Sequence, residues 1–172
     1  MATAYTELNG IHNPSTGTSP PAAWGDGVRD NLDALYNPPL GHVYKVAVQS
    51  VADATDTVLL FDTEYEDTDG LHSTVTNTGR FTAAKAGWYL ALINVSWAAS
   101  TVGRRRIALR KNGSATWYQN QDAPATSVTT NQNVVQLFDL AVNDYVDAIG
   151  YQNTGGALDA TAQFQIVRVS GT

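Results

Sequence analysis

The chain has 172 residues, of which 43% are hydrophobic and 15% charged, with no cysteine and a formal net charge of -6 at pH 7. These values predict one folded domain with some additional chain, and they exclude disulfides and thiolate metal sites. The acidic balance argues against nucleic-acid binding, which needs a basic surface. No stretch approaches the roughly 18 apolar residues of a membrane-spanning helix, so we expect no membrane insertion.

The composition changes near residue 39. Residues 1–39 are rich in Pro, Gly, Ser, Thr and Asn, and their one periodic segment is PPAAWGDGVRDNLDALY. Apolar residues recur in it at helical spacing, and prolines stand at a helix entrance and directly after its end. The predicted stripe consists of Trp24, Val28, Leu32 and Leu35. We predict an extended arm and a short amphipathic helix, which either folds back on its own domain or docks on a partner.

From Leu40 onward short β-runs alternate with turn residues, and we predict no helix. The predicted strands lie near residues 42–49, 57–61, 79–83, 88–97, 104–111, 115–120, 134–141, 145–151 and 162–169. The predicted turns are Asp69-Gly70, Asn112-Gly113 and Gly155-Gly156. Eight or nine strands at about this spacing indicate an all-β, antiparallel jelly-roll sandwich over residues 40–172.

The strand predicted at 88–97 is apolar on both faces at its beginning. Trp88, Leu90 and Leu92 start one face, and the other consists of Tyr89, Ala91, Ile93, Val95 and Trp97. The outer face of a two-layer sandwich normally meets water, so a two-sided apolar strand predicts an oligomer interface. We assign that interface to the five residues of the second set. The alternative is a central strand covered by its own loops or by the N-terminal helix.

The order of several motifs resembles the trimeric jelly rolls of the tumour necrosis factor superfamily and the globular heads of the first complement component. The motifs are GRFTAAKAGWYLALINVSW, IALRKNG, VNDYVDAIGYQNTGG and FQIVRV, together with the upstream loop FDTEYEDTDGLHS. Asn143 stands where the family's Gly-Asp-x-Val turn has its glycine. The resemblance covers about residues 42–170 and implies a homotrimer whose inner sheets pack around a threefold axis.

The segment STGTSPPAAWGDGVRDNLDALYNPP resembles leader segments on small virion proteins of tailed phages, particularly phages of actinobacteria. That resemblance implies attachment to a phage particle through residues 1–39. The start MATAYTELNG lacks the basic and apolar regions of a signal peptide, so we expect these residues in the mature protein and assembly in the host cytoplasm.

No catalytic or metal-binding pattern emerges from the chain, and we expect no cofactor. The three histidines are scattered, and no Gly-x-Ser-x-Gly elbow or phosphate-binding glycine loop occurs. An acidic run at 62–69 offers carboxylates, but it lacks the spacing of a calcium loop, so we interpret it as a solvated loop. Whether it holds calcium stays open.

Two sets of residues are candidates for ligand or receptor contact. The basic run RRRIALRK places Arg104, Arg106 and Arg110 on one strand face, where they either bind a polyanion or are solvated or paired between subunits. Trp117, Tyr118, Gln119 and Asn120 combine rings and amides suited to a sugar, although these rings can equally fill the barrel mouth.

These observations together predict a non-enzymatic homotrimer in a phage virion. The favoured placement is a minor tail or fibre-tip protein that contacts a host glycan or receptor. A capsid decoration or head-fibre protein is the first alternative, and a secreted ligand of the tumour necrosis factor type is the second.

Overall fold

The computed structural model describes residues 28–29, 32, 35–124 and 126–170, without the side chains of residues 115–120. The chain divides into two units, Met1–Asn37 and Pro38–Thr172. In the first unit the described backbone is helical at residues 28–29, 32 and 35–36. No helix among the described residues is long and apolar enough to cross a membrane.

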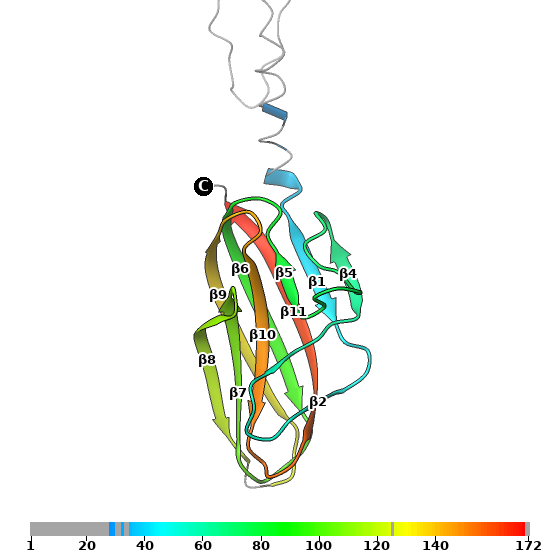
Figure 1. The fold of residues 1–172 in the computed structure, drawn as a ribbon, viewed down its shortest axis with the longest axis vertical. Coiled ribbons are helices and arrows are strands. Elements are labelled where there is room, and N and C mark those ends of the chain that lie inside the picture. Colours follow the sequence, from blue (N-terminus) through cyan, green and yellow to red (C-terminus); the bar gives the residue numbers. More distant parts are fainter. Residues whose placement is uncertain (1–27, 30–31, 33–34, 125, 171–172) are drawn as a thin grey trace, which may run out of the picture. The chain divides into compact units, whose positions relative to one another are not determined.

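The described residues of the second unit form eleven strands in two sheets that lie face to face (Figure 1). The strands are β1 (Leu40–Tyr44), β2 (Gln49–Val51), β3 (Thr57–Val58), β4 (Thr63–Asp67), β5 (Arg80–Thr82), β6 (Gly87–Trp97), β7 (Arg104–Lys111), β8 (Ser114–Asp122), β9 (Thr130–Leu140), β10 (Tyr145–Gln152) and β11 (Leu158–Ser170). No helix interrupts the described part of this unit, as the sequence predicts.

The larger sheet has the order β4-β1-β11-β6-β9, with β2 also paired to β11. The smaller sheet has the order β3-β10-β7-β8, with β5 also paired to β10. The strand pairs are antiparallel, and from β8 onward successive strands alternate between the sheets. This arrangement confirms the predicted all-β antiparallel jelly-roll sandwich.

The hydrophobic core lies between the sheets. Along β6 every second side chain is buried, as expected for a strand with one face in the core. An aromatic cluster surrounds Phe164, whose ring centroid is 4.7 Å from that of Phe81 and 5.6 Å from that of Phe61. The indole Nε1 of Trp97 donates a hydrogen bond of 2.8 Å to Oε1 of Gln132, so the one polar atom of this buried ring is satisfied.

The predicted strand at 42–49 is divided into β1 and β2, which corrects that prediction. After Tyr44 the chain leaves the sheet, and Val46 N donates to Oδ1 of Asp62 at 3.1 Å. Val43 is buried in β1, but Val46 and Val48 are 71% and 55% exposed, so these two valines do not mark a buried strand face. Similarly, only Thr57–Val58 of the predicted 57–61 strand pairs with another strand, β10. Leu59 and Phe61 are nevertheless buried in the core.

The acidic run at 62–69 contains β4, so its interpretation as a loop was wrong over Thr63–Asp67. The strand β4 pairs with β1 at the edge of the sheet. The ring of Tyr65 on β4 stacks on the ring of Tyr44 on β1, with centroids 4.4 Å apart. No side chain of β4 is buried, so the strand shows no apolar alternation, and its charges resist edge pairing with other chains. The sequence therefore carried little signal for it.

Two turns use left-handed backbone at asparagine. Asn112 and Gly113, with φ of 50° and 78°, form the predicted two-residue turn between β7 and β8. Asn143 has φ of 71°, a region in which asparagine is enriched among residues other than glycine. Asparagine therefore adopts at this turn a conformation that glycine adopts most readily.

Asp144 connects this turn to the β7–β8 turn. Its Oδ1 accepts a hydrogen bond of 2.8 Å from Asn112, and its Oδ2 accepts from Ala141 N at 2.9 Å and lies 2.9 Å from Lys111 Nζ. These contacts, those with Lys111 and Asn112 first, lower the pKa of Asp144 from 3.8 to about 2. The carboxylate thus stabilises the folded state in its ionised form.

We predict that Asp144→Ala lowers the free energy of unfolding at pH 7 by about 1 kcal/mol, a value reduced for partial exposure. The pKa of Asp144 in the folded state lies below the unfolded value of 3.8. The stabilisation by its carboxylate is therefore complete at pH values above 3.8 and is lost as the pH falls through about 2. Urea unfolding at pH 7, 4 and 2 measures it. Asp159→Ala, at an exposed position on β11, is the control and should cost little at any of these pH values. A difference for Asp144→Ala that persists at pH 2 would contradict the assignment.

Candidate functional site

The outer face of the larger sheet carries an unusual surface. On β6 the side chains that point away from the core begin with Trp88, Leu90 and Leu92. Trp88 and Leu90 are 40% and 39% exposed, which is high for large apolar groups on a central strand. The face that the sequence analysis left without a cover is therefore exposed in the single chain.

Neighbouring strands extend this surface at the same level. Leu90 pairs with Val167 of β11 on one side and with Leu137 of β9 on the other, and Val167 in turn pairs with Leu40. Leu92 lies opposite Val135, which is 54% exposed. We call this set the apolar half of the outer face: Leu40, Trp88, Leu90, Leu92, Val135, Leu137 and Val167. Contiguous exposed apolar surface of this kind typically marks an interaction site.

The five residues to which the sequence analysis assigned the interface lie on the opposite side of β6. Tyr89, Ala91, Ile93, Val95 and Trp97 are 0 to 2% exposed and belong to the chain's own core. They cannot contact another subunit while the sandwich is closed, so the interface was assigned to the wrong face. Both faces begin with large apolar residues, and the apolar pattern alone does not show which one turns inward.

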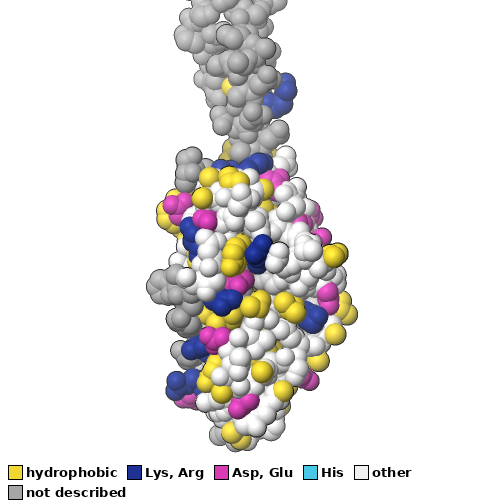
Figure 2. Space-filling model, viewed as in Figure 1, with side chains coloured by type: hydrophobic (Ala, Val, Ile, Leu, Met, Phe, Trp, Pro, Cys, Tyr) yellow, Lys and Arg dark blue, Asp and Glu magenta, His cyan; other side chains and the backbone are white. Residues whose placement is uncertain are grey.

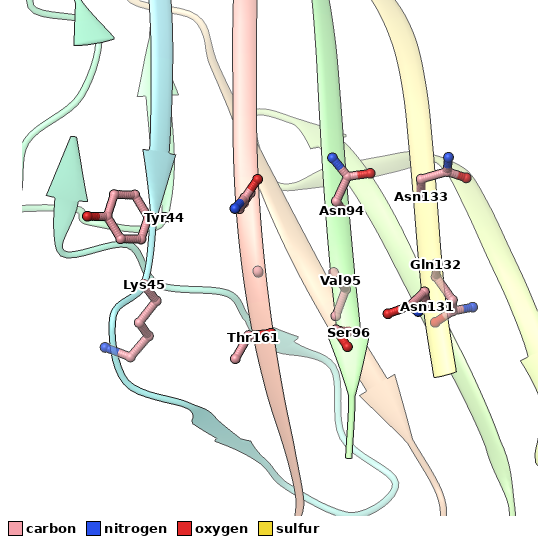
Figure 3. Close-up of a pocket in the computed structure, with 11 residues that line it drawn as sticks. Tyr44, Lys45, Asn94, Val95, Ser96, Asn131, Gln132, Asn133 and Thr161 are labelled. Atoms are coloured by element: carbon pink, nitrogen blue, oxygen red, sulfur yellow. The ribbon is translucent and has the colours of Figure 1, made fainter. Parts of the chain in front are cut away.

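The other half of the outer face is polar. Next to the apolar half, a first row of paired residues on β11, β6 and β9 consists of Gln163, Asn94 and Asn133. A second row, further from the apolar half, consists of Thr161, Ser96 and Asn131. These residues line a groove of about 460 Å³ together with Tyr44 and Lys45 from the β1 side. We call it the amide groove. Figure 3 shows Asn94 on β6 and Asn133 on β9 at one level, with Thr161, Ser96 and Asn131 at the next.

The predicted basic residues lie on the outer face of the smaller sheet, and each is paired within the chain. Arg104 Nε is 3.0 Å from Asp122, and Arg106 pairs with Asp56. Arg110 makes two hydrogen bonds to Asp147, at 2.8 and 2.5 Å, which raise the pKa of its guanidinium.

Figure 2 shows basic and acidic side chains interspersed over this face. The Arg106 guanidinium also makes a cation–π contact, since it lies 4.7 Å from the centroid of the Tyr151 ring. Pairing with acids from other parts of the chain leaves little net positive charge for a polyanion, and this favours the solvated or paired interpretation over ligand binding.

Arg105, which the sequence analysis did not single out, is fully buried. Its guanidinium donates to the carbonyl oxygens of Ser100 and Val102 at 2.8 and 3.1 Å, and burial lowers its pKa. These hydrogen bonds hold the loop between β6 and β7, so Arg105 has a structural role. Its burial could have been predicted from the sequence, because it lies in the same inward-facing row of β7 as Ile107 and Leu109.

The other predicted contact residues, Trp117, Tyr118, Gln119 and Asn120, belong to the edge strand β8, which pairs with β7. Their side chains lie outside the described part of the structure. Of the predicted anchoring stripe, Val28, Leu32 and Leu35 have helical backbone, whereas Trp24 lies outside the described residues.

The acidic run is held by contacts within the chain. Glu64 Oε1 lies 2.9 Å from Nδ1 of His72, whose Nε2 lies 3.0 Å from the Thr78 carbonyl oxygen. Asp67 accepts hydrogen bonds from the main chain of Leu71 and His72 at 2.7 and 3.0 Å. Val46 N and then Lys45 lower the pKa of Asp62. Among the described residues, no three His, Cys, Asp or Glu side chains form a group that could hold a metal ion.

The strand order and the two-layer packing define a jelly-roll fold, and this fold is similar to those of complement C1q and tumour necrosis factor domains. The globular domain of zebrafish complement 1qA is similar to it with a TM-score of 0.62 and 17% identity, over 78% of this chain and 99% of that one. The tumour necrosis factor Eiger of S. frugiperda is similar with a TM-score of 0.59 and 13% identity, over 78% of this chain and 94% of that one. Murine APRIL is similar with a TM-score of 0.53 and 11% identity, over 77% of this chain and 100% of that one. No protein-family model and no curated protein matches the sequence.

We predict opposite outcomes for charges placed on the two faces of β6. Ile93→Asp buries an unpaired carboxylate in the core, at a cost of about 3 kcal/mol or more, which is a large share of typical domain stability. It should abolish the cooperative thermal transition measured by circular dichroism. Asn94→Asp, on the neighbouring outward position, should fold with nearly unchanged Tm. Equal damage from both substitutions would contradict the assignment of the faces.

Proposed function

We propose that the chain is a non-enzymatic homotrimer whose copies meet through the apolar half of the outer face. The observation that carries this proposal is the exposure of Trp88, Leu90, Val135 and Leu137 on adjacent strands of one sheet. Removal of such side chains from water is the main favourable contribution to most associations between proteins. A trimer also agrees with the superfamily resemblance, in which the corresponding sheets pack around a threefold axis.

The proposed location is a phage particle, with residues 1–39 as the attachment segment. Support comes from the leader-like sequence around Trp24 and from the predicted stripe on a helix too short to be stable alone. The tandem Pro38-Pro39 follows as a stiff spacer before β1. The jelly roll is then the part presented to the surroundings, and the favoured role is contact with the host surface from the tail.

A capsid decoration or head-fibre protein remains the alternative placement, and copy number distinguishes the two. A few trimers per particle indicate a tail protein, whereas hundreds indicate a shell protein, and quantitative mass spectrometry of purified particles gives this number. The proposal of a secreted ligand has less support, because the leader-like segment points to a particle.

We predict that Leu90→Asp and Leu137→Asp each convert the trimer into a folded monomer. Three carboxylates would be brought together and desolvated around the axis, which costs several kcal/mol. Light scattering at micromolar concentration gives the oligomeric state, and circular dichroism reports folding. Val75→Asp, at an 84% exposed position outside this face, is the control and should remain trimeric. A monomeric wild-type chain would refute the proposed trimer.

We predict that the pair of substitutions Trp24→Asp and Leu32→Asp leaves the trimer and its Tm nearly unchanged but prevents entry into particles. Charges on the apolar stripe oppose docking because they must be desolvated. Complementation of a deletion phage, followed by immunoblotting of purified particles, measures incorporation. Deletion of residues 1–37 should have the same effect. A trimer that dissociates or melts far lower would mean that the helix packs on its own jelly roll.

A further inference from the structure

His72 is the one titratable side chain in residues 70–79, which lead from β4 to β5. We call these residues the β4–β5 connection. The side chain of His72 is fully buried. Its ring meets two core rings edge-on, with centroids 6.5 Å from that of Phe61 and 5.7 Å from that of Phe81. Water does not reach the ring, so its two nitrogens depend on partners within the chain.

Both nitrogens of this ring face oxygen atoms. Nδ1 lies 2.9 Å from Oε1 of Glu64, and Nε2 lies 3.0 Å from the carbonyl oxygen of Thr78. A neutral imidazole has one N–H group and one nitrogen lone pair, whereas a carbonyl oxygen and an ionised carboxylate can only accept. A neutral His72 ring beside an ionised Glu64 therefore sets a nitrogen lone pair against an oxygen lone pair, whichever tautomer it adopts.

One added proton removes this conflict. The Thr78 carbonyl requires a proton on Nε2 of His72, because the carbonyl has none to donate. A second proton then lies between Nδ1 and Glu64, either on the ring, as an imidazolium beside a carboxylate, or on the carboxyl group. In both arrangements His72 and Glu64 together hold one proton more than a neutral ring and an ionised carboxylate do.

The charges around the ring favour this proton. The charged groups on the elements that pack against His72 are Glu64, Asp67, Asp62, Asp69 and Arg80. Asp67 accepts the main-chain N–H of His72 itself at 3.0 Å. Asp62 and Asp69 each lie within 3.0 Å of a lysine ammonium, and the Arg80 guanidinium lies 4.4 Å from the centroid of the Tyr145 ring. Acids outnumber bases here, and an excess of negative charge favours retention of a proton.

The same contacts fasten the β4–β5 connection to the sandwich. The Thr78 carbonyl that faces His72 also accepts from Phe61 N at 3.0 Å, and Thr82 N donates to the Leu71 carbonyl at 2.7 Å. His72 thus joins the two ends of the connection to each other and to Glu64 on β4. Without the shared proton the Glu64 carboxylate can turn toward water, because its side chain is 35% exposed. The buried ring can reach water only if the connection opens.

We propose that a proton shared by His72 and Glu64 fastens the β4–β5 connection, and that a rise in pH releases this proton and opens the connection. The unfolded chain has no such contact, and its histidines release their protons near about pH 6.5. The stabilisation is therefore complete below that pH and is lost as the pH rises above it. The device is complete within one chain and depends neither on the trimer nor on a particle.

The first measurement locates the proton by NMR of the full-length chain. Nitrogen-15 shifts of the His72 ring and carbon-13 shifts of the Glu64 carboxyl are recorded from pH 6 to 9, with the urea-unfolded chain as reference. At pH 7.5 we expect a proton on Nε2 and a second one on either Nδ1 or the carboxyl group. A neutral ring beside an ionised carboxylate at this pH would overturn the proposal.

The second measurement follows opening by hydrogen exchange at one chain concentration. Between pH 6.5 and 8.5 the protection factors of the Phe61 and Thr82 amides should fall by at least about tenfold, because opening is linked to the loss of one proton. The Ile93 amide, in the centre of β6, is the internal reference and should keep its protection. Unchanged protection of Phe61 and Thr82 over this range would contradict a proton-dependent connection.

Two matched variants separate the shared proton from a general effect of charge. In Glu64→Gln the side-chain amide can donate to a neutral Nδ1 while Nε2 still donates to Thr78, so the connection should stay closed and lose its pH dependence. Glu66→Gln removes the same charge from an exposed position on β4 and should behave as the wild type. Wild-type pH dependence in Glu64→Gln, or its loss in Glu66→Gln, would overturn the proposal.

Discussion

The arrangement of the whole jelly roll depends on the pairing of β6 over its full length, with β11 on one side and β9 on the other. Two continuous ladders leave this strand no freedom of register, so its side chains form two fixed rows. One row, from Tyr89 to Trp97, fills the space between the sheets. The other, from Trp88 to Ser96, supplies the centre of both the apolar half and the amide groove. A shift of one residue would exchange the rows and place Asn94 in the core.

The sequence carried the positions of the strands from β5 onward and the two-sided character of β6, because both follow from a period of two and from turn residues. The first residues of the strand alone did not show which row faces inward, since Trp88, Leu90 and Leu92 are as apolar as their neighbours. The useful signal lay further along the strand. Asn94 and Ser96 share a row with Trp88, and polar residues in a row mark the side that faces water. That pattern would have assigned the exposed face correctly.

Features assembled from distant strands could not be predicted in this way. The arginines of β7 have the appearance of an anion site in isolation, and their partners Asp56, Asp122 and Asp147 come from other parts of the chain. The amide groove likewise draws on β6, β9 and β11, none of which carries a recognisable motif at these positions. Register between strands is a property of the folded sheet, so surfaces of this kind emerge only when the pairing is known.

The pairing of Leu40 with Val167 places the first strand's beginning and the last strand's end at one pole of the sandwich, as Figure 1 also shows. The loops that join β6 to β7, β8 to β9 and β10 to β11 lie at the opposite pole, where insertions leave the ladders intact. The loops at this pole can therefore change in length and sequence while the pairing of β1 and β6 with β11 stays in place, so one scaffold can present many different surfaces there.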